Sequence, residues 1–515
     1  MNWAKSILSR FIPSGVMSVI AEIGLLLVEG GFAALVLNLD VLPTKYLVPL
    51  IIVLLLIFLG MMLLLGSPKK SIRRLLGFLI TLVVICVTLL GCSYLYSTSE
   101  TFNQVTEKIV RHDEYDVVVL KNSKYKEVAD LDGTNVYIAK STLKTYKEAQ
   151  GQLKGKASVE YKTKDEYREI GNLIVEENGT QHDNVALLSK ANYSLLCEDI
   201  EGFEDNTKIL TKFSIAQTDE KDTGTIDVTK DSFNVYISGI DVWGDINKRV
   251  SRSDVNMIMT VNPKTRQILL TSIPRDAYVK LHSSGQLDKL THSGIYGIDE
   301  TTGTIEDWLG VDLNFYIRAN FGMIVKLVDA VDGIKVYSKY DFKSAISEYE
   351  YHKGWNKLGG KAALYFARER KSFKDMDQER IKNQQRVVKA VLKKMMKSEV
   401  ILTNYTDIMD AIKTNMQTDM SSQEIASLVK MQIGDMKGWK INMNSIKGTM
   451  DKKGTYSMGY DRMLDVCIMD DDSINKAVKL INEVMYPEDG KKVKIKDDKS
   501  SNGLRKTIDG KIISN

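Results

Sequence analysis

Cysteine, histidine and proline are scarce in this chain of 515 residues, which contains four, five and seven of them respectively. With 44% hydrophobic residues and so little proline, the chain is neither collagen-like nor of low complexity, and it is not disordered as a whole. The cysteines form no CxxC pair and no zinc-finger spacing, so we expect neither a disulfide framework nor a structural zinc site. Only Cys197 and Cys467 lie beyond the apolar N-terminal part, and nothing favours a bridge between them. HExxH and GxSxG sequences are also absent.

An excess of positive charge is missing from most of the chain. Residues 1–95 hold seven of the 70 Lys and Arg residues and three of the 66 acids, so the rest of the chain holds 63 of each. General nucleic-acid binding needs a basic surface that neutralises phosphates. A neutral remainder therefore argues against a nucleic-acid partner.

Long apolar runs are present only near the N-terminus. Three of them, 16–37, 46–65 and 75–95, are each about 20 residues long, which is enough to cross a bilayer. A cleaved signal peptide cannot account for three such runs. The first run contains Glu22 and Glu29, which share a helix face, and we expect them to face another helix or a polar cavity rather than lipid.

The basic residues around these runs indicate their orientation. The link between the second and third runs, residues 66–74, carries four Lys or Arg residues and no acid. Such loops stay on the cytoplasmic side of a membrane. Lys5 and Arg10 place the N-terminus on the same side, so everything after Tyr96 is expected outside the cell.

Strand and helix patterns divide the chain into a membrane region at 1–96, two further domains and a tail. Residues 97–217 alternate short strands with helices, which predicts an accessory α/β domain, and no titratable cluster suggests chemistry there. Residues 218–231 are polar and acidic and read as a linker. Residues 232–486 mix strands and helices without a repeat, which predicts an α/β/α sandwich. The Lys-rich residues 487–515 are expected to be a disordered tail.

Arginines and aspartates gather at the ends of three strands predicted in the larger domain. Guanidinium groups match phosphate oxygens in pairs, so arginines at strand ends suit a phosphate ligand. Two aspartates from different strand ends can hold Mg²⁺, which prefers oxygen ligands and bridges phosphates. The alternative is that these residues form ordinary surface ion pairs, each of which contributes about 0–1 kcal/mol to stability. The residues concerned are Asp241, Arg252, Asp254, Arg275 and Asp276.

A second charged group follows about a hundred residues later. Arg368 and Arg370 share one side of their segment if it is extended, while Asp377, Arg380 and Gln384 recur on one face of a predicted helix, 377–396. The same face continues with apolar residues, so the stripe is charged at one end and apolar at the other. This suits an amphiphile with a phosphate head and a lipid tail. The apolar end consists of Val387, Val388 and Val391.

Taken together, these segments resemble the LytR–CpsA–Psr family. Their order and intervals fit over residues 233–485, about half of the chain, and the combination is specific although each motif alone is weak. Three membrane runs and an accessory module before the family domain resemble the capsule-operon branch found in streptococci. The matching stretches are YISGID at 236–241, SRSD at 251–254, SIPRD at 272–276, DKLTH at 288–292, RER at 368–370 and residues 377–385.

The resemblance implies an extracytoplasmic phosphotransferase of Gram-positive bacteria, with an α/β/α sandwich fold and a multi-pass anchor in the cell membrane. Such proteins transfer a glycan polymer from an undecaprenyl-pyrophosphate carrier to peptidoglycan and form a phosphodiester. The polymer expected for this chain is capsular polysaccharide. The lipid tail lies in an apolar groove, and Mg²⁺ is the cofactor. The implied partners are the lipid-linked glycan, peptidoglycan, the membrane and the capsule-synthesis machinery.

The resemblance also assigns roles to individual residues, and the general base stays undecided between Asp241 and Asp377. Three positions depart from the family pattern: Trp243 replaces a usual arginine, and Met376 and Glu379 replace usual glycines. The pyrophosphate would be bound by Arg252, Arg275, Lys289, Arg368, Arg370, Arg380 and Gln384, magnesium by Asp241 and Asp254, and the catalytic candidates are Arg275, Asp241 and Asp377.

Two other functions stay open at this point. One is a membrane-bound sensor or regulator of capsule synthesis, which binds the lipid-linked precursor without turning it over. The other is a polyprenyl-pyrophosphate hydrolase that uses water as the acceptor.

The charge pattern around the apolar runs predicts a testable topology. A reporter fused after Lys70 should be cytoplasmic, and one fused after Asp222 should be outside, because the basic link stays inside. Protease accessibility in intact protoplasts measures both positions. Cleavage at Lys70 from outside would contradict the assignment, because lipid-linked wall precursors would then lie on the wrong side.

Overall fold

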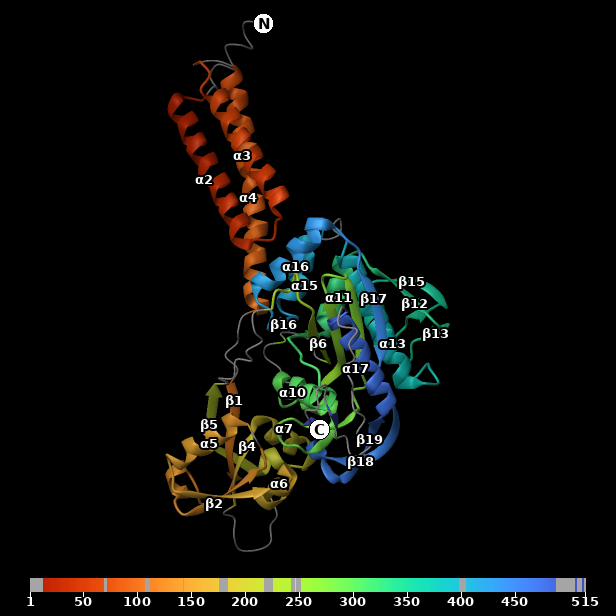
Figure 1. The fold of residues 1–515 in the computed structure, drawn as a ribbon. Helices are drawn as coiled ribbons and strands as arrows, with labels where there is room; N and C mark the ends of the chain where they lie inside the picture. Colours follow the sequence, from red (N-terminus) through yellow and green to blue (C-terminus); the bar gives the residue numbers. More distant parts are fainter. Residues whose placement is uncertain are drawn as a thin grey trace.

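A computed structural model describes residues 13–68, 72–106, 112–141, 143–175, 184–216, 226–241, 246, 252–397 and 404–487, with two short strands, β20 (Arg505–Lys506) and β21 (Ile512–Ile513). The N-terminal helices project from one end of the molecule, and two mixed α/β domains lie below them (Figure 1).

Three long helices form the N-terminal part, and each is long and apolar enough to cross a membrane. They are α2 (Gly15–Leu39), α3 (Thr44–Leu65) and α4 (Ile72–Thr106), which confirms the three predicted runs and extends the third into the region beyond. Helix α2 packs on α4, where a Cβ at Gly91 would lie 2.7 Å from the Phe32 ring. Glu29 is buried, as predicted, while Glu22 is partly exposed.

The accessory domain is a five-stranded sheet with the order β3-β2-β4-β1-β5. It confirms the predicted α/β pattern, with apolar clusters on both faces of the sheet. Its strands are β1 (His112–Leu120), β2 (Thr134–Ala139), β3 (Val159–Lys164), β4 (Val185–Ser189) and β5 (Thr207–Ala216); its helices are η1 (Val128–Leu131), α5 (Lys144–Lys154), α6 (Tyr167–Val175), α7 (Lys190–Asp199) and α8 (Phe203–Asn206).

The larger domain contains a six-stranded sheet with the order β16-β11-β6-β7-β8-β17. Strand β7 is antiparallel to both of its neighbours, while β11 runs parallel to β6 and β17 runs parallel to β8. The start of β7 therefore meets the ends of β6, β8, β11 and β17 at one edge of the sheet. The strands are β6 (Phe233–Ile240), β7 (Ser253–Asn262), β8 (Gln267–Ile273), β11 (Phe315–Asn320), β16 (Met416–Thr418) and β17 (Lys440–Ser445).

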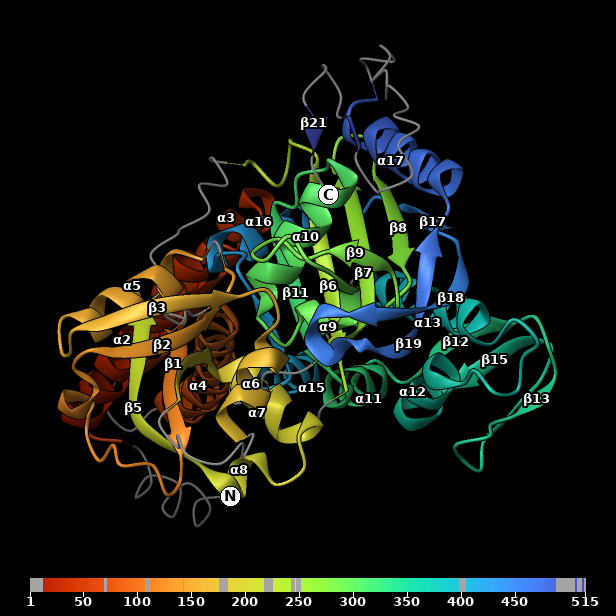
Figure 2. The ribbon, with the colours of Figure 1, turned by 90° about the horizontal axis from the view of Figure 1, so that it is seen from below.

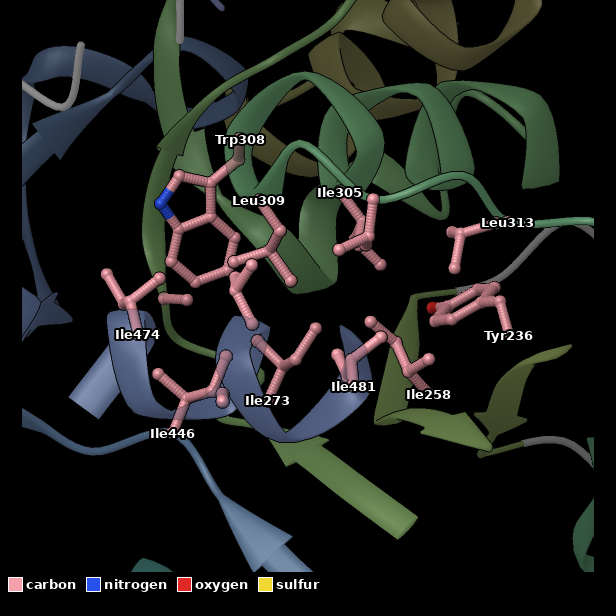
Figure 3. Close-up of a cluster of buried hydrophobic side chains, with 14 of the residues drawn as sticks. Tyr236, Ile258, Ile273, Ile305, Trp308, Leu309, Leu313, Ile446, Ile474 and Ile481 are labelled. Carbon is pink, nitrogen blue, oxygen red and sulfur yellow. The ribbon is translucent and has the colours of Figure 1, made fainter. Parts of the chain in front are cut away.

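Helices cover both faces of this sheet, which confirms the predicted α/β/α sandwich. On one face, α10 (Ile298–Leu309) and α17 (Asp471–Met485) pack through Trp308 and Ile481 onto Ile258 and Ile273 (Figure 3). On the other face lie α13 (Met376–Met395) and α16 (Ser422–Asp435). Beside them are α11 (Phe321–Ala330), α12 (Gly360–Arg368) and α15 (Tyr405–Lys413); the smaller elements are β9 (Tyr278–Lys280), β10 (Leu287–Lys289), α9 (Leu290–Ser293), β12 (Ile334–Ser338), β13 (Phe342–Lys343), β14 (Glu350–Tyr351), β15 (Gly354–Leu358), β18 (Gly448–Thr455), η3 (Tyr456–Met458) and β19 (Gly459–Met469).

The larger domain packs directly against the C-terminal ends of α2 and α4. Leu39 and Phe102 belong to the same buried cluster as α11, α13 and α15. At the rim of this contact, Lys413 pairs with Glu100 at 2.9 Å and Lys430 pairs with Asp40 at 2.6 Å. The domain is thus held against its anchor by packing and charge as well as by the chain.

The accessory domain is held in a similar way at the end of the larger domain away from the N-terminal helices (Figure 1), and Figure 2 shows it beside the larger domain from below. Tyr167 and Leu196 share a buried cluster with Tyr456 and Met458, and the Tyr167 and Tyr456 rings meet edge to face at 5.8 Å. Arg168 extends from α6 to Asp461 of β19 at 2.6 Å. The two domains therefore form one packed unit.

Parts of the predicted linker and tail look different or lie outside the described residues. Val228, within the predicted linker 218–231, is buried against the sheet of the larger domain, because this segment packs beside β6. Residues 217–225 are outside the described residues, as is nearly all of the predicted tail 487–515. Cys197 and Cys467 are not joined by a disulfide.

Candidate active site

The edge where β6, β7 and β8 meet carries the predicted aspartates. Gly239 pairs with Val255 and Ile240 pairs with Ser253, so Asp254 is an extra residue in β7 and forms a β-bulge. Bulges redirect side chains and are common beside functional sites. Gly239 allows this close approach, since a Cβ there would lie 2.7 Å from the Cβ of Val255.

Arg275 follows the end of β8 and lies between two carboxylates. Its Nη1 donates to Asp254 at 2.8 Å, and its Nε lies 3.7 Å from Asp276. Burial alone would lower the pKa of the Arg275 guanidinium, but Asp254 and Asp276 outweigh it and the pKa is raised. Lys289, at the end of β10, reaches the same group and pairs with Asp276 at 2.8 Å. The structure thus places Lys289 beside Arg275, as the resemblance implied.

Arg380 brings a second, more deeply buried guanidinium to this edge. Its side chain is 9% exposed and pairs with Asp377 one turn earlier on α13, at 2.7 Å. Burial, partly opposed by Asp377, lowers the pKa of Arg380, and the positive charges of Arg275 and Arg370 lower it further. Their mutual influence shows that arginines from three segments converge here.

Glu369 lies between Arg368 and Arg370 and separates their side chains. Its structural role was not predicted from the sequence. Glu369 is fully buried and accepts hydrogen bonds from the Ser344 hydroxyl at 2.8 Å and the Ala345 amide at 2.7 Å. Arg368 pairs with Asp241 at 3.2 Å and stacks on Phe321 at 4.4 Å. Glu369 therefore fixes the backbone from which the two arginines project. The alternating charges RER could have suggested that the central residue points the other way.

The DKLTH motif contributes only Lys289 to this group. Asp288 is fully buried, bonds His292 Nδ1 at 2.6 Å and accepts from the Ser457 amide at 2.8 Å and from its hydroxyl. This ties β10 to the segment that packs on Tyr167 of the accessory domain. Asp288 and His292 thus hold the backbone from which Lys289 projects, and His292 has a structural role in the polar core.

Two predicted ligands lie at the margin of the group. Arg252 is exposed just before β7, and Gln384 is half-buried on α13. The neighbouring Gln385 is the buried one, and its amide bridges the carbonyls of Leu270 and Asn444 between β8 and β17.

The sequence predicts a lipid groove at the apolar end of the α13 stripe, but the structure places these valines in the hydrophobic core. Val387 and Val391 are buried in the cluster shared with the anchor, and Val388 packs against the cluster beneath the sheet. They form core contacts rather than the wall of an open slot. A helix stripe that fits a lipid groove also fits a hydrophobic core, and sequence cannot distinguish the two.

The departures from the family pattern have local explanations. Met376 has a φ of 31°, a left-handed conformation that favours the usual glycine, so its side chain is strained there. Glu379 is buried and pairs with Arg386 at 2.6 Å and Lys382 at 3.3 Å, which gives it a structural role. Trp243 lies outside the described residues.

The donor set is too small to hold a metal by itself. Among the described residues, no group of three His, Cys, Asp or Glu side chains is placed to bind one. Asp241 and Asp254 each use one oxygen for an arginine, which leaves a second carboxylate oxygen on each. Mg²⁺ commonly takes one or two protein carboxylates and completes its shell with phosphate and water. These residues therefore fit Mg²⁺ in the presence of a phosphate ligand.

A sequence model of the LytR–CpsA–Psr family, described as LytR_cpsA_psr, matches residues 201–470, just over half of the chain. The chain belongs to this family. Its LytR–CpsA–Psr region is 32% identical over 200 residues to the polyisoprenyl-teichoic acid–peptidoglycan teichoic acid transferase TagU of Enterococcus faecalis, covering 39% of this chain and 65% of that protein. The Bacillus subtilis protein of the same name is 31% identical over 242 residues, covering 46% and 76%. A crystal structure of B. subtilis TagU is 26% identical and covers 50% of this chain and 97% of its own, with a TM-score of 0.38.

The buried Glu369 of the LytR–CpsA–Psr domain makes a pH-dependent contribution to stability. Burial raises its pKa, but hydrogen bonds from Ser344, Ala345, Ser372 and Arg370 outweigh this and leave the pKa below its ordinary 4.5. A lowered carboxyl pKa stabilises the fold above about pH 4.5, and this contribution is lost as the pH falls through the folded pKa. Glu369→Gln should cost roughly 1–3 kcal/mol at pH 7 and flatten the loss of stability below pH 4.5.

Denaturant unfolding of the full chain in detergent at pH 7 and at pH 4 measures this effect. Glu348→Gln is the matched control, because Glu348 is exposed on the loop that carries Ser344 and Ala345. Equal stability losses for the two variants would contradict the role of Glu369.

Proposed function

We propose that this protein transfers a glycan polymer from an undecaprenyl-pyrophosphate carrier to peptidoglycan and forms a phosphodiester, with capsular polysaccharide as the expected polymer. The observation that carries the proposal is the convergence of Arg275, Arg380, Arg368 and Lys289 at one sheet edge beside the membrane anchor. The names of the teichoic acid transferases of E. faecalis and B. subtilis support the same reaction class. The three spans and the accessory domain support the capsule branch.

A pyrophosphate would exchange partners with the aspartates at this edge. Its oxygens can replace Asp254 and Asp276 on Arg275, and Asp377 on Arg380, without new burial of the guanidiniums. Phosphoryl transfer depends mainly on positioning and charge stabilisation. Arginines held by Glu369 and by the end of β8 supply both, because they are already in place before the substrate binds.

The chemical step is a substitution at the phosphorus that carries the glycan. A hydroxyl oxygen of peptidoglycan forms a bond to this phosphorus, and the bond to the bridging oxygen of the pyrophosphate breaks. Undecaprenyl phosphate leaves with its negative charge stabilised by the arginines, and the hydroxyl proton passes to a carboxylate. Asp241 and Asp377 both lie at this edge, and the carboxylate of either residue can accept the proton. Mg²⁺ held by Asp241 and Asp254 would neutralise further phosphate charge when bound.

Packing between the domain and its anchor supports a substrate that is itself held in the membrane. The cluster that contains Val387 and Val391 of α13 continues through α11 and α15 to Leu95 and Phe102 of α4. These are buried core contacts, so they hold the helix that bears Arg380 firmly against the membrane helices. A polyprenyl tail that stays in the membrane would then have its pyrophosphate head on the side of the domain where the arginines are held.

Removal of the site arginines should reduce transfer more than stability. Arg275→Ala and Arg368→Ala should each lower transfer by roughly 100-fold or more, the usual scale for losing one charge-stabilising donor. Lysine at either position should restore activity only in part, because a point charge cannot contact two oxygens at once. A wall-attachment assay beside a melting curve measures both quantities.

The same assay separates the alternatives. Carrier phosphate released without a glycan acceptor would indicate hydrolysis, and binding without release would indicate a sensor. Variants that melt many degrees lower and lose attachment only in proportion would show that Arg275 and Arg368 are structural.

The magnesium assignment predicts a specific change in metal dependence. Asp254→Ala should weaken the Mg²⁺ requirement for pyrophosphate binding more than it weakens folding, since the side chain projects from a bulge at the sheet edge. Isothermal titration with a short-chain polyprenyl pyrophosphate, with and without Mg²⁺, measures this without turnover. An unchanged requirement in Asp254→Ala would rule out the assignment.

A further inference from the structure

A cleft of about 520 Å³, lined mainly by polar and charged side chains, lies at β17, at the opposite end of the strand order from β16, which contacts α4. It is formed by α13, the end of β17 and the start of α17, and β17 lies between the two helices and contacts both (Figure 2). Its volume is within the range of small-ligand sites. The residues that line it are Lys382, Gln385, Arg386, Met443, Asn444, Ser445, Lys447, Asp470, Asp472, Ser473 and Lys476.

The cleft opens at the same edge of the sheet as the proposed reaction site. Lys382 is two residues from Arg380 on α13. Ser445 pairs with Ser272, which is three residues before Arg275. Both Lys382 and Ser445 line the cleft, so a chain lying in it ends close to the arginines.

The lining is suited to an acidic, hydroxyl-rich ligand rather than to a lipid. Four of its side chains are cations and two are acids, and the rest are mostly amides and hydroxyls. Lys447 and Lys476 are exposed and form no ion pair with any described residue, whereas Lys382 and Arg386 are already paired with Glu379. The Nδ2 atom of Asn444 is buried and lacks a hydrogen-bond partner among the described residues.

We propose that this cleft binds the acceptor, a peptidoglycan strand recognised through its sugar hydroxyls and the carboxylates of its peptides. The inference rests on the proposed function, in which two substrates must meet at the arginines. The anchor helix α4 contacts β16 at one end of the strand order, whereas the cleft lies at β17, the strand at the other end. An acceptor in the cleft would thus approach the arginines from the side of the sheet opposite to the anchor, and its hydroxyl would reach the pyrophosphate from there.

Charge reversal at the two unpaired lysines tests this assignment. The double variant Lys447→Glu/Lys476→Glu should raise the KM for soluble peptidoglycan fragments roughly tenfold, because two screened attractions become repulsions. The KM for the lipid-linked donor and kcat at saturating acceptor should stay unchanged. Fragments whose carboxylates are amidated should bind the wild type weakly and respond little to the variant.

The control variant Lys452→Glu/Lys479→Glu makes the same change of net charge on exposed lysines outside the cleft. It should leave both KM values unchanged, and melting curves should show that all variants fold. A raised donor KM in the cleft variant, equal effects in the control, or no effect on acceptor KM would each overturn the proposal.

Equilibrium binding of the fragments to the full chain, without donor, separates this inference from the proposed function. Fragment binding that falls roughly tenfold in the cleft variant supports the acceptor site even if the wild type shows no transfer. Wild-type transfer with fragment binding unchanged in the cleft variant shows that the acceptor binds elsewhere.

Discussion

Several positively charged side chains must be held close together at one edge of the six-stranded sheet. Most of the larger domain contributes to holding them there. Arg275 and Arg380 are largely buried, and each would repel the other without compensation. Aspartates beside them supply that compensation in the absence of a ligand. Further from the edge, Glu369 and Asp288 are buried carboxylates that hold backbone segments, so the cations projecting from those segments have fixed positions.

Two interfaces extend this rigidity to the whole chain. At one end, the cluster around Phe102 and the Lys413–Glu100 pair join the domain to α4. At the other, the segment bound by Asp288 also packs on Tyr167 of the accessory domain. A movement of the accessory domain would therefore act on β10 and on Lys289. The three parts behave as one body around a single charged edge.

Much of the site could be predicted because strand ends are easy to recognise. Asp241, Asp254 and Arg275 flank apolar strands, and antiparallel neighbours bring such ends to one edge. The partners of Glu369 and Asp288 could not be predicted, since Ser344 and Ser457 come from segments 25 and 169 residues away. Equally, sequence gave no sign that Asp254 occupies a bulge, because a bulge depends on the register of two strands rather than on either one.

The attachment of the larger domain to α4 has a consequence for the reach of the charged edge. Asn320 at the end of β11 bonds Asn415, which follows directly on the α15 helix that contacts α4. Asn320 is also the register partner of Ile240, next to Asp241. The charged edge is thus joined to α4 through β11, Asn415 and α15, by packing and hydrogen bonds as well as by the chain. An anchor attached in this way limits how far the edge can move from the membrane helices, so the reach of the site is set by the folded parts and not by the length of a flexible linker.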